Sequence, residues 1–194
     1  MFNTNQKWLA AVLVLITSGC ATTKTPQTNN YYLLESVTSQ STINSNRQIT
    51  LLPIQLSDYL KSANLHVKSD AGQIIYSQTD LWAEQPSKIL WFAMQQSLEG
   101  RTGRHVLASY DVTDSCAEIK IQINELSPST TGNVATEGRW FINANNKTLL
   151  TNNFSFSGKI DNDGFTASNL VTAKHLDQLA SQLNEKITSV GLCR

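Results

Sequence analysis

Few side chains in this sequence are of the types that perform catalysis or bind metals, so their spacing decides what chemistry they support. The histidines His66, His105 and His175 lie far apart, and none belongs to an H-E-x-x-H pattern or lies beside a carboxylate at ligand spacing. Asp161 and Asp163 begin like a calcium loop, but the remaining ligands and the closing Glu are missing. G-x-S-x-G and P-loop motifs are also missing. We therefore expect no catalytic residue, no metal and no cofactor, and we favour a binding protein over an enzyme.

Cys20 has the most specific surroundings of the three cysteines. Nine apolar residues, positions 8–16, follow Lys7 and lead into small residues and the cysteine. The run is too short to span a bilayer, which takes about 20 residues, but it fits the apolar part of a signal peptide. Its ending resembles a bacterial lipobox, although Thr17 stands where Leu is usual. We expect residues 1–19 to be a lipoprotein signal peptide and Cys20 to carry acyl chains such as palmitate.

The residues after Cys20 support this interpretation. Residues 20–30 are mostly Thr, Asn, Pro and Gln and are predicted to form a flexible tether, followed by a single domain at residues 31–194. The alternative, a short core helix in a cytosolic protein, is disfavoured because this polar stretch cannot continue a packed element. In enteric-type bacteria an Asp directly after the acylated cysteine retains lipoproteins in the inner membrane. Ala21 at this position predicts the periplasmic face of the outer membrane.

Cys116 and Cys193 are the two thiols that remain once Cys20 is acylated, and export places them in an oxidising compartment. Cys116 comes directly before a predicted strand in which apolar and polar residues alternate. Its place in this alternation puts it on the polar face of the strand. Cys193 follows the last apolar residue of a C-terminal helical pattern. We expect a disulfide between them that holds this helix to the sheet. The alternative is a buried, reduced Cys116.

The charge pattern excludes a nucleic-acid-binding function. The chain has 15 basic and 15 acidic residues, and no run of Lys or Arg. Binding to phosphates depends on such positive charge.

Hydrophobic periodicity predicts an α+β fold: a mostly antiparallel sheet with two helices packed on one face, the longer helix being C-terminal. The first helix is predicted to begin at Pro86 and to stop at Gly100. The second has apolar residues at helical spacing from Leu176 to Val190. Strands are expected at residues 30–34, 49–56, 64–69, 73–77, 104–110, 117–123, 136–143 and 148–160, with a turn at Asn145-Asn146 between the last two.

Four short segments of the chain are informative together: NNYYLL at 29–34, LPIQLSDYL at 52–60, DLWAE at 80–84 and EGRW at 137–140. In this order they resemble the PqiC/YmbA family of lipoproteins, which are auxiliary components of ABC-type lipid transport systems. Ser57 stands where the family usually has Pro. Four such segments in this order behind a lipobox are more specific than any one of them alone. The resemblance extends over most of residues 30–190.

This resemblance implies a role in lipid transport between membranes. Such lipoproteins bind an MCE-domain, PqiB-like protein, whose other end is held in the inner membrane, and support envelope integrity. Because aromatic residues are common interface anchors, we nominate Trp82 and Trp91 as partner contacts. A homo-oligomer is also compatible with this role. The alternative is a free-standing periplasmic lipoprotein that binds a small ligand or peptidoglycan.

Overall fold

The structure is a computed structural model, which describes residues 28–35, 37, 42–43, 45–109, 115–162 and 164–193. The predicted signal peptide, Cys20 and most of the predicted tether lie outside the described residues. Among the described residues, no helix combines the length and apolar character needed to cross a membrane.

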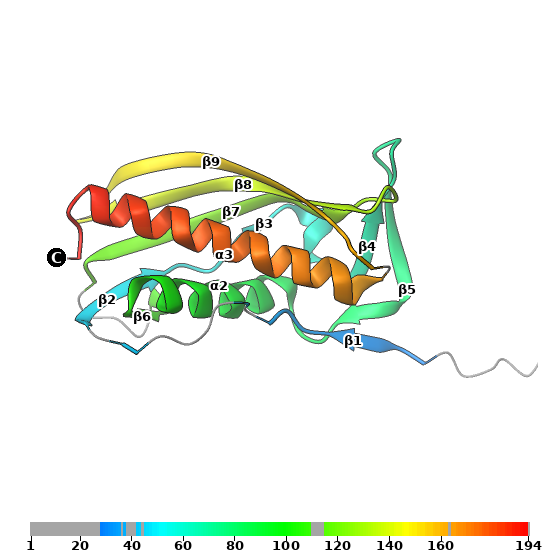
Figure 1. The fold of residues 1–194 in the computed structure, drawn as a ribbon, viewed down its shortest axis with the longest axis horizontal. Coiled ribbons are helices and arrows are strands. Elements are labelled where there is room, and N and C mark those ends of the chain that lie inside the picture. The colour runs from blue at the N-terminus through cyan, green and yellow to red at the C-terminus, as the bar shows by residue number, and fades with distance from the viewer. Residues whose placement is uncertain are drawn as a thin grey trace, which may run out of the picture.

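The larger of two sheets forms one layer of the molecule (Figure 1). Its six strands are β2 (Ser45–Leu51), β3 (Gln55–Leu56), β6 (Arg104–Leu107), β7 (Ala117–Pro128), β8 (Asn133–Ala144) and β9 (Lys147–Lys159). They run in the order β6-β2-β7-β8-β9, with β3 also paired to β7. The long ladders β7–β8 and β8–β9 are antiparallel, as predicted. β2 and β3 pair in parallel with β7, and β2 also pairs in parallel with β6, which the sequence pattern did not reveal.

The apolar run at residues 49–56 forms two strands instead of the single predicted one. Pro53 lies between β2 and β3 and has no N–H to donate to a ladder. The amide of Leu52 still donates to the carbonyl of Ile119 (2.9 Å), and pairing with β7 resumes at Gln55, opposite Gln122.

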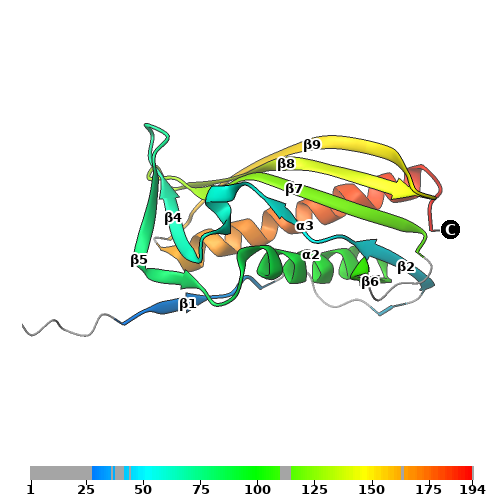
Figure 2. The same ribbon diagram turned by 180° about the vertical axis from the view of Figure 1, so that it is seen from behind.

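Helices α2 (Pro86–Thr102) and α3 (Phe165–Ser189) pack on the same face of this sheet, as Figures 1 and 2 show. The α+β prediction, with the longer helix C-terminal, is confirmed. Pro86 does open α2, because its fixed φ suits the first turn. The predicted stop at Gly100 is wrong: the helix continues, and Gly103 ends it at φ 62°, with its N–H donating to Glu99 O (2.9 Å).

A smaller sheet stands at the end of the molecule opposite the C-terminus (Figure 2). Its strands are β1 (Asn30–Tyr32), β4 (Asn64–Lys68) and β5 (Ile74–Trp82), in the order β1-β5-β4. β4 and β5 form the predicted antiparallel hairpin. A short 3-10 helix, η1 (Asp58–Lys61), precedes β4 and leads the chain from the larger sheet to the smaller one.

The turn between β8 and β9 is the predicted one. Asn145 and Asn146 have φ angles of 50° and 59°, the left-handed conformation that a two-residue hairpin turn requires and that Asn tolerates. This turn lies at the same end of the molecule as the C-terminus (Figure 1).

Candidate functional site

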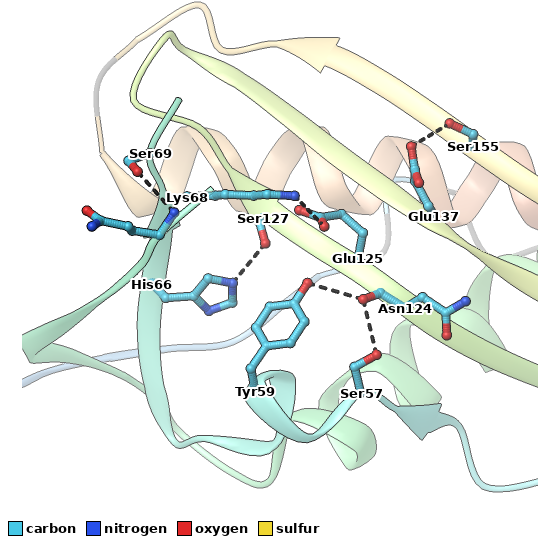
Figure 3. Close-up of polar contacts among 11 residues, drawn as sticks. Ser57, Tyr59, His66, Lys68, Ser69, Asn124, Glu125, Ser127, Glu137 and Ser155 are labelled. Atoms are coloured by element: carbon cyan, nitrogen blue, oxygen red, sulfur yellow. Dashed lines mark hydrogen bonds and ion pairs between the residues drawn. The ribbon is translucent and has the colours of Figure 1, made fainter. Parts of the chain in front are cut away.

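A cluster of polar side chains lies where η1 and β4 cover part of β7 (Figure 3). We call the residues Tyr59, His66, Lys68, Glu125 and Ser127 the polar cluster. His66 Nε2 lies 3.0 Å from Ser127 Oγ, and Lys68 Nζ donates to Glu125 Oε2 at 2.7 Å. The rings of Tyr59 and His66 meet edge to face, with centroids 5.5 Å apart. The cluster therefore fastens the small sheet to the large one.

An irregularity in β7 places the cluster on the side of the sheet away from the helices. The register with β8 shifts between Ile123 and Glu125, so one extra residue, Asn124, lies in the strand. The Asn124 carbonyl accepts hydrogen bonds from both Ser57 Oγ and Tyr59 OH, each at 3.2 Å. Because of the bulge, Leu126 turns into the core while Glu125 and Ser127 point towards β4.

Gly138 lies opposite this bulge, paired with Ile123. A Cβ at this position would lie 2.0 Å from the backbone oxygen of Gln122 and 2.7 Å from the ring of Phe154. No side chain fits, which gives a physical reason for glycine in the EGRW segment.

The polar cluster resembles part of a serine–histidine catalytic arrangement, but its geometry favours a structural role. The side chains of His66 and Ser127 are both buried, so a substrate has no open approach to the hydroxyl. The carboxylate of Glu125 is bonded to Lys68 and does not orient the imidazole as a third catalytic group would. Burial lowers the pKa of His66, with Glu125 acting in the opposite direction, so the imidazole is neutral near pH 7.

Asp80 links two of the segments that carry the family resemblance, and sequence reasoning missed this. Its carboxylate accepts hydrogen bonds from Asn30 Nδ2 (2.9 Å), Tyr32 OH (3.1 Å) and Ser77 Oγ (2.7 Å). These donors, Asn30 first, lower the pKa of Asp80. The bonds hold β1 parallel to β5, where Asn30 and Asp80 are register partners. A single strand does not reveal its partner, so no sequence signal pointed to this contact.

The nomination of Trp82 as a partner contact is corrected by its burial. Only 7% of the residue is exposed, and it belongs to the hydrophobic core. It lies at the end of β5 opposite Tyr32, where the small sheet meets the helices. Its aromatic surface is used inside the fold.

Trp91 lies at the surface of α2 and is half-buried. Its indole N–H donates to the carbonyl of Leu51 (3.1 Å), which fixes the ring against β2. The neighbouring Phe92 is 46% exposed and meets Trp91 edge to face at 5.2 Å. Both aromatic residues line an open groove of about 500 Å³, together with Pro53 and Ile54. We call this feature the α2 groove.

The structure joins Cys116 and Cys193 in a disulfide, with Cα atoms 5.0 Å apart. The bond connects the segment that follows α3 to the residue directly before β7. Gln48 accepts a hydrogen bond from the Cys116 amide (3.0 Å), and Arg104 Nη2 donates to the Cys193 carbonyl (2.7 Å). Cys20, the predicted lipid attachment site, lies outside the described residues.

The three histidines lie in unrelated environments. His66 belongs to the polar cluster, His105 is exposed, and His175 is buried with Nδ1 2.9 Å from Thr136 Oγ1. Within the part of the chain that the structure describes, no group of three His, Cys, Asp or Glu side chains is placed to hold a metal ion.

Solved structures of other proteins have a similar fold. The chain matches no curated protein sequence. A crystal structure of an uncharacterized protein is similar at 19% identity and a TM-score of 0.72, covering 82% of this chain and 99% of the other. A Xanthomonas campestris protein of the family DUF330 is similar at 12% identity and a TM-score of 0.60, covering 81% and 91%. These likenesses concern the fold alone.

The sequence itself carries a more specific match. The family model described as "ABC-type transport auxiliary lipoprotein component" matches residues 31–187, which include both sheets except the first residue of β1, all of α2 and nearly all of α3. The resemblance inferred from the four short segments is therefore confirmed. This chain belongs to the family of ABC-type transport auxiliary lipoproteins.

Proposed function

We propose that the chain is an outer-membrane lipoprotein subunit of an MCE-type system that moves phospholipid between the two membranes. In this role Cys20 carries the lipid anchor, and the folded domain binds the periplasmic end of the MCE-domain protein. The single observation that carries the proposal is the family match over residues 31–187. The domain acts by binding and performs no catalysis, which agrees with the buried Ser127 and His66 of the polar cluster.

The α2 groove is the surface that we propose for the MCE-domain partner. Phe92 exposes a large apolar ring, and Lys88 Nζ lies 5.8 Å from the centre of that ring. Trp91 is fixed by its bond to Leu51, so little side-chain entropy is lost when a partner covers it. A rigid aromatic pair at the edge of an open groove has the character of an interface hot spot.

Co-purification in mild detergent tests this proposal. The tagged full chain is expected to retain an MCE-domain protein, identified by mass spectrometry. Phe92→Ala is expected to weaken retention, because loss of a hot-spot side chain costs about 2 kcal/mol, or roughly thirtyfold in Kd. The matched control is Leu149→Ala, since Leu149 is 47% exposed on β9, away from the groove.

Two outcomes would count against the proposal in different ways. Equal retention by wild type and Phe92→Ala would show that the α2 groove is not the contact. Recovery of no MCE-domain protein by the wild-type chain, from membranes that contain one, would contradict the transport role itself. It would favour a free-standing lipoprotein that binds a small ligand or peptidoglycan.

A further inference from the structure

A second apolar surface lies beside the first described residues of the chain. Tyr31 and Leu33, in and just after β1, are 65% and 60% exposed, and Leu170 on α3 is 51% exposed. All three line one open groove of about 730 Å³ between β1 and the first turns of α3. We call Tyr31, Leu33 and Leu170 the anchor-side patch. Large apolar side chains gathered in this way mark a surface that another apolar phase or protein covers.

The position of the patch in the chain indicates what covers it. Tyr31 follows Cys20 by eleven residues, a distance of at most roughly 38 Å when fully extended. A lipid on Cys20 therefore keeps the patch within reach of the membrane at all times. Such tethering raises the effective concentration of a weak second contact, so even a small patch can hold the domain against the bilayer.

The chemistry of the patch fits a lipid surface. Tyrosine has an apolar ring and a polar hydroxyl, and it is enriched at the boundary between hydrocarbon and water. The acidic residues Glu35 and Asp161 and the basic residue Lys174 also line the groove. Because both signs are present, contact with lipid is expected to rest on apolar insertion and not on attraction to anionic headgroups.

We infer that the anchor-side patch inserts into the surface of the membrane that carries the lipid anchor, and so fixes the orientation of the domain on it. This inference rests on the lipid anchor of the proposed function. β1 lies on the opposite side of the two helices from β9 in both Figure 1 and Figure 2. Docking through β1 and α3 therefore turns the β9 edge of the large sheet towards the periplasm.

Fluorescence quenching by brominated lipid tests the inference. The mature lipidated chain is reconstituted into phosphatidylethanolamine–phosphatidylcholine vesicles with the environment-sensitive dye NBD at Leu170→Cys. The matched control carries the dye at Leu149→Cys, a residue of similar exposure on β9. We expect a blue shift and loss of emission with brominated lipid at position 170, unchanged by high salt, and neither effect at position 149.

The possible failures are distinguishable. If the wild-type chain does not float with vesicles, the lipid anchor of the proposed function is wrong. If it floats but the dye at position 170 is quenched no more than the dye at 149, the docking inference is overturned. A blue shift without bromine quenching, growing with the ratio of protein to lipid, would assign the patch to a second copy and also overturn the inference. Replacing both Tyr31 and Leu33 by Ser is expected to reduce quenching at position 170 while flotation is retained.

Discussion

Removing the disulfide by the double substitution Cys116→Ala and Cys193→Ala is expected to destabilise the domain without altering its fold. The two cysteines are 77 positions apart, so the bond closes a long loop of the unfolded chain. The loop-closure relation gives about 4.5 kcal/mol for a loop of this length at room temperature. For a domain of this size, each kcal/mol shifts Tm by roughly 2–4 °C, so we expect a decrease of roughly 9–18 °C.

The double variant should keep its helices, because α3 is held to the sheet along its length by buried residues. Leu176, Leu179, Leu183 and Ile187 are all less than 3% exposed. The expected result is therefore a native circular dichroism spectrum with a lower unfolding midpoint. Wild-type protein unfolded in the presence of a reductant should show the same decrease, which is the control for the substitutions.

Two results would refute this reasoning. Alkylation of two thiols in protein taken directly from the periplasmic face would show that the bond does not form in the cell. A disulfide-bonded wild-type protein whose midpoint equals that of the double variant would show that the closed loop contributes no stability.

Two further predictions concern the core. Gly138→Ala should lower stability by about 3 kcal/mol, the upper part of the range for overpacking, because the backbone oxygen of Gln122 cannot rotate away; an unchanged urea midpoint would contradict this. Burial lowers the pKa of both His66 and His175 below the usual 6.5, so the unfolded chain binds protons more readily as pH falls. Their contribution to stability is complete above about pH 6.5 and declines below it. The urea midpoint should be lower at about pH 5.5 than at about pH 7.5, and His175→Gln should make this difference smaller. An equal difference in that variant would show that His175 does not contribute to the pH dependence.

The long antiparallel part of the fold was predictable because its signals are local. Alternation along residues 117–123 identifies a strand with one buried face, and adjacent asparagines at 145–146 suit a tight hairpin turn. Parallel pairings left no such signal, because β2 meets β6 and β7 across long connections. The sequence shows that Pro53 lacks an N–H for strand pairing, but it does not show that the run at 49–56 forms two strands or that pairing with β7 resumes at Gln55.

The candidate site was predictable only where a local sequence pattern indicated it. The positions of Cys116 and Cys193 at the ends of predicted elements indicated that they could meet, and the structure joins them. The sequence did not show that Trp82 is buried in the core while Trp91 lies at the surface. A tryptophan indicates a large aromatic side chain, but not whether that side chain points into the core or outwards. The bond between Asp80 and Asn30 depends on register between strands fifty residues apart, which no local pattern contains.

Photo-crosslinking at position 92 in living cells tests the central claim most directly. A photoreactive phenylalanine analogue replaces Phe92 in the tagged, lipidated chain, and a second chain carries it at Leu149, the exposed control on β9. We expect an ultraviolet-dependent crosslink from position 92 to an MCE-domain protein and none from position 149. A chain that reaches the outer membrane but forms no such crosslink at position 92, or forms it equally at both positions, would contradict the account.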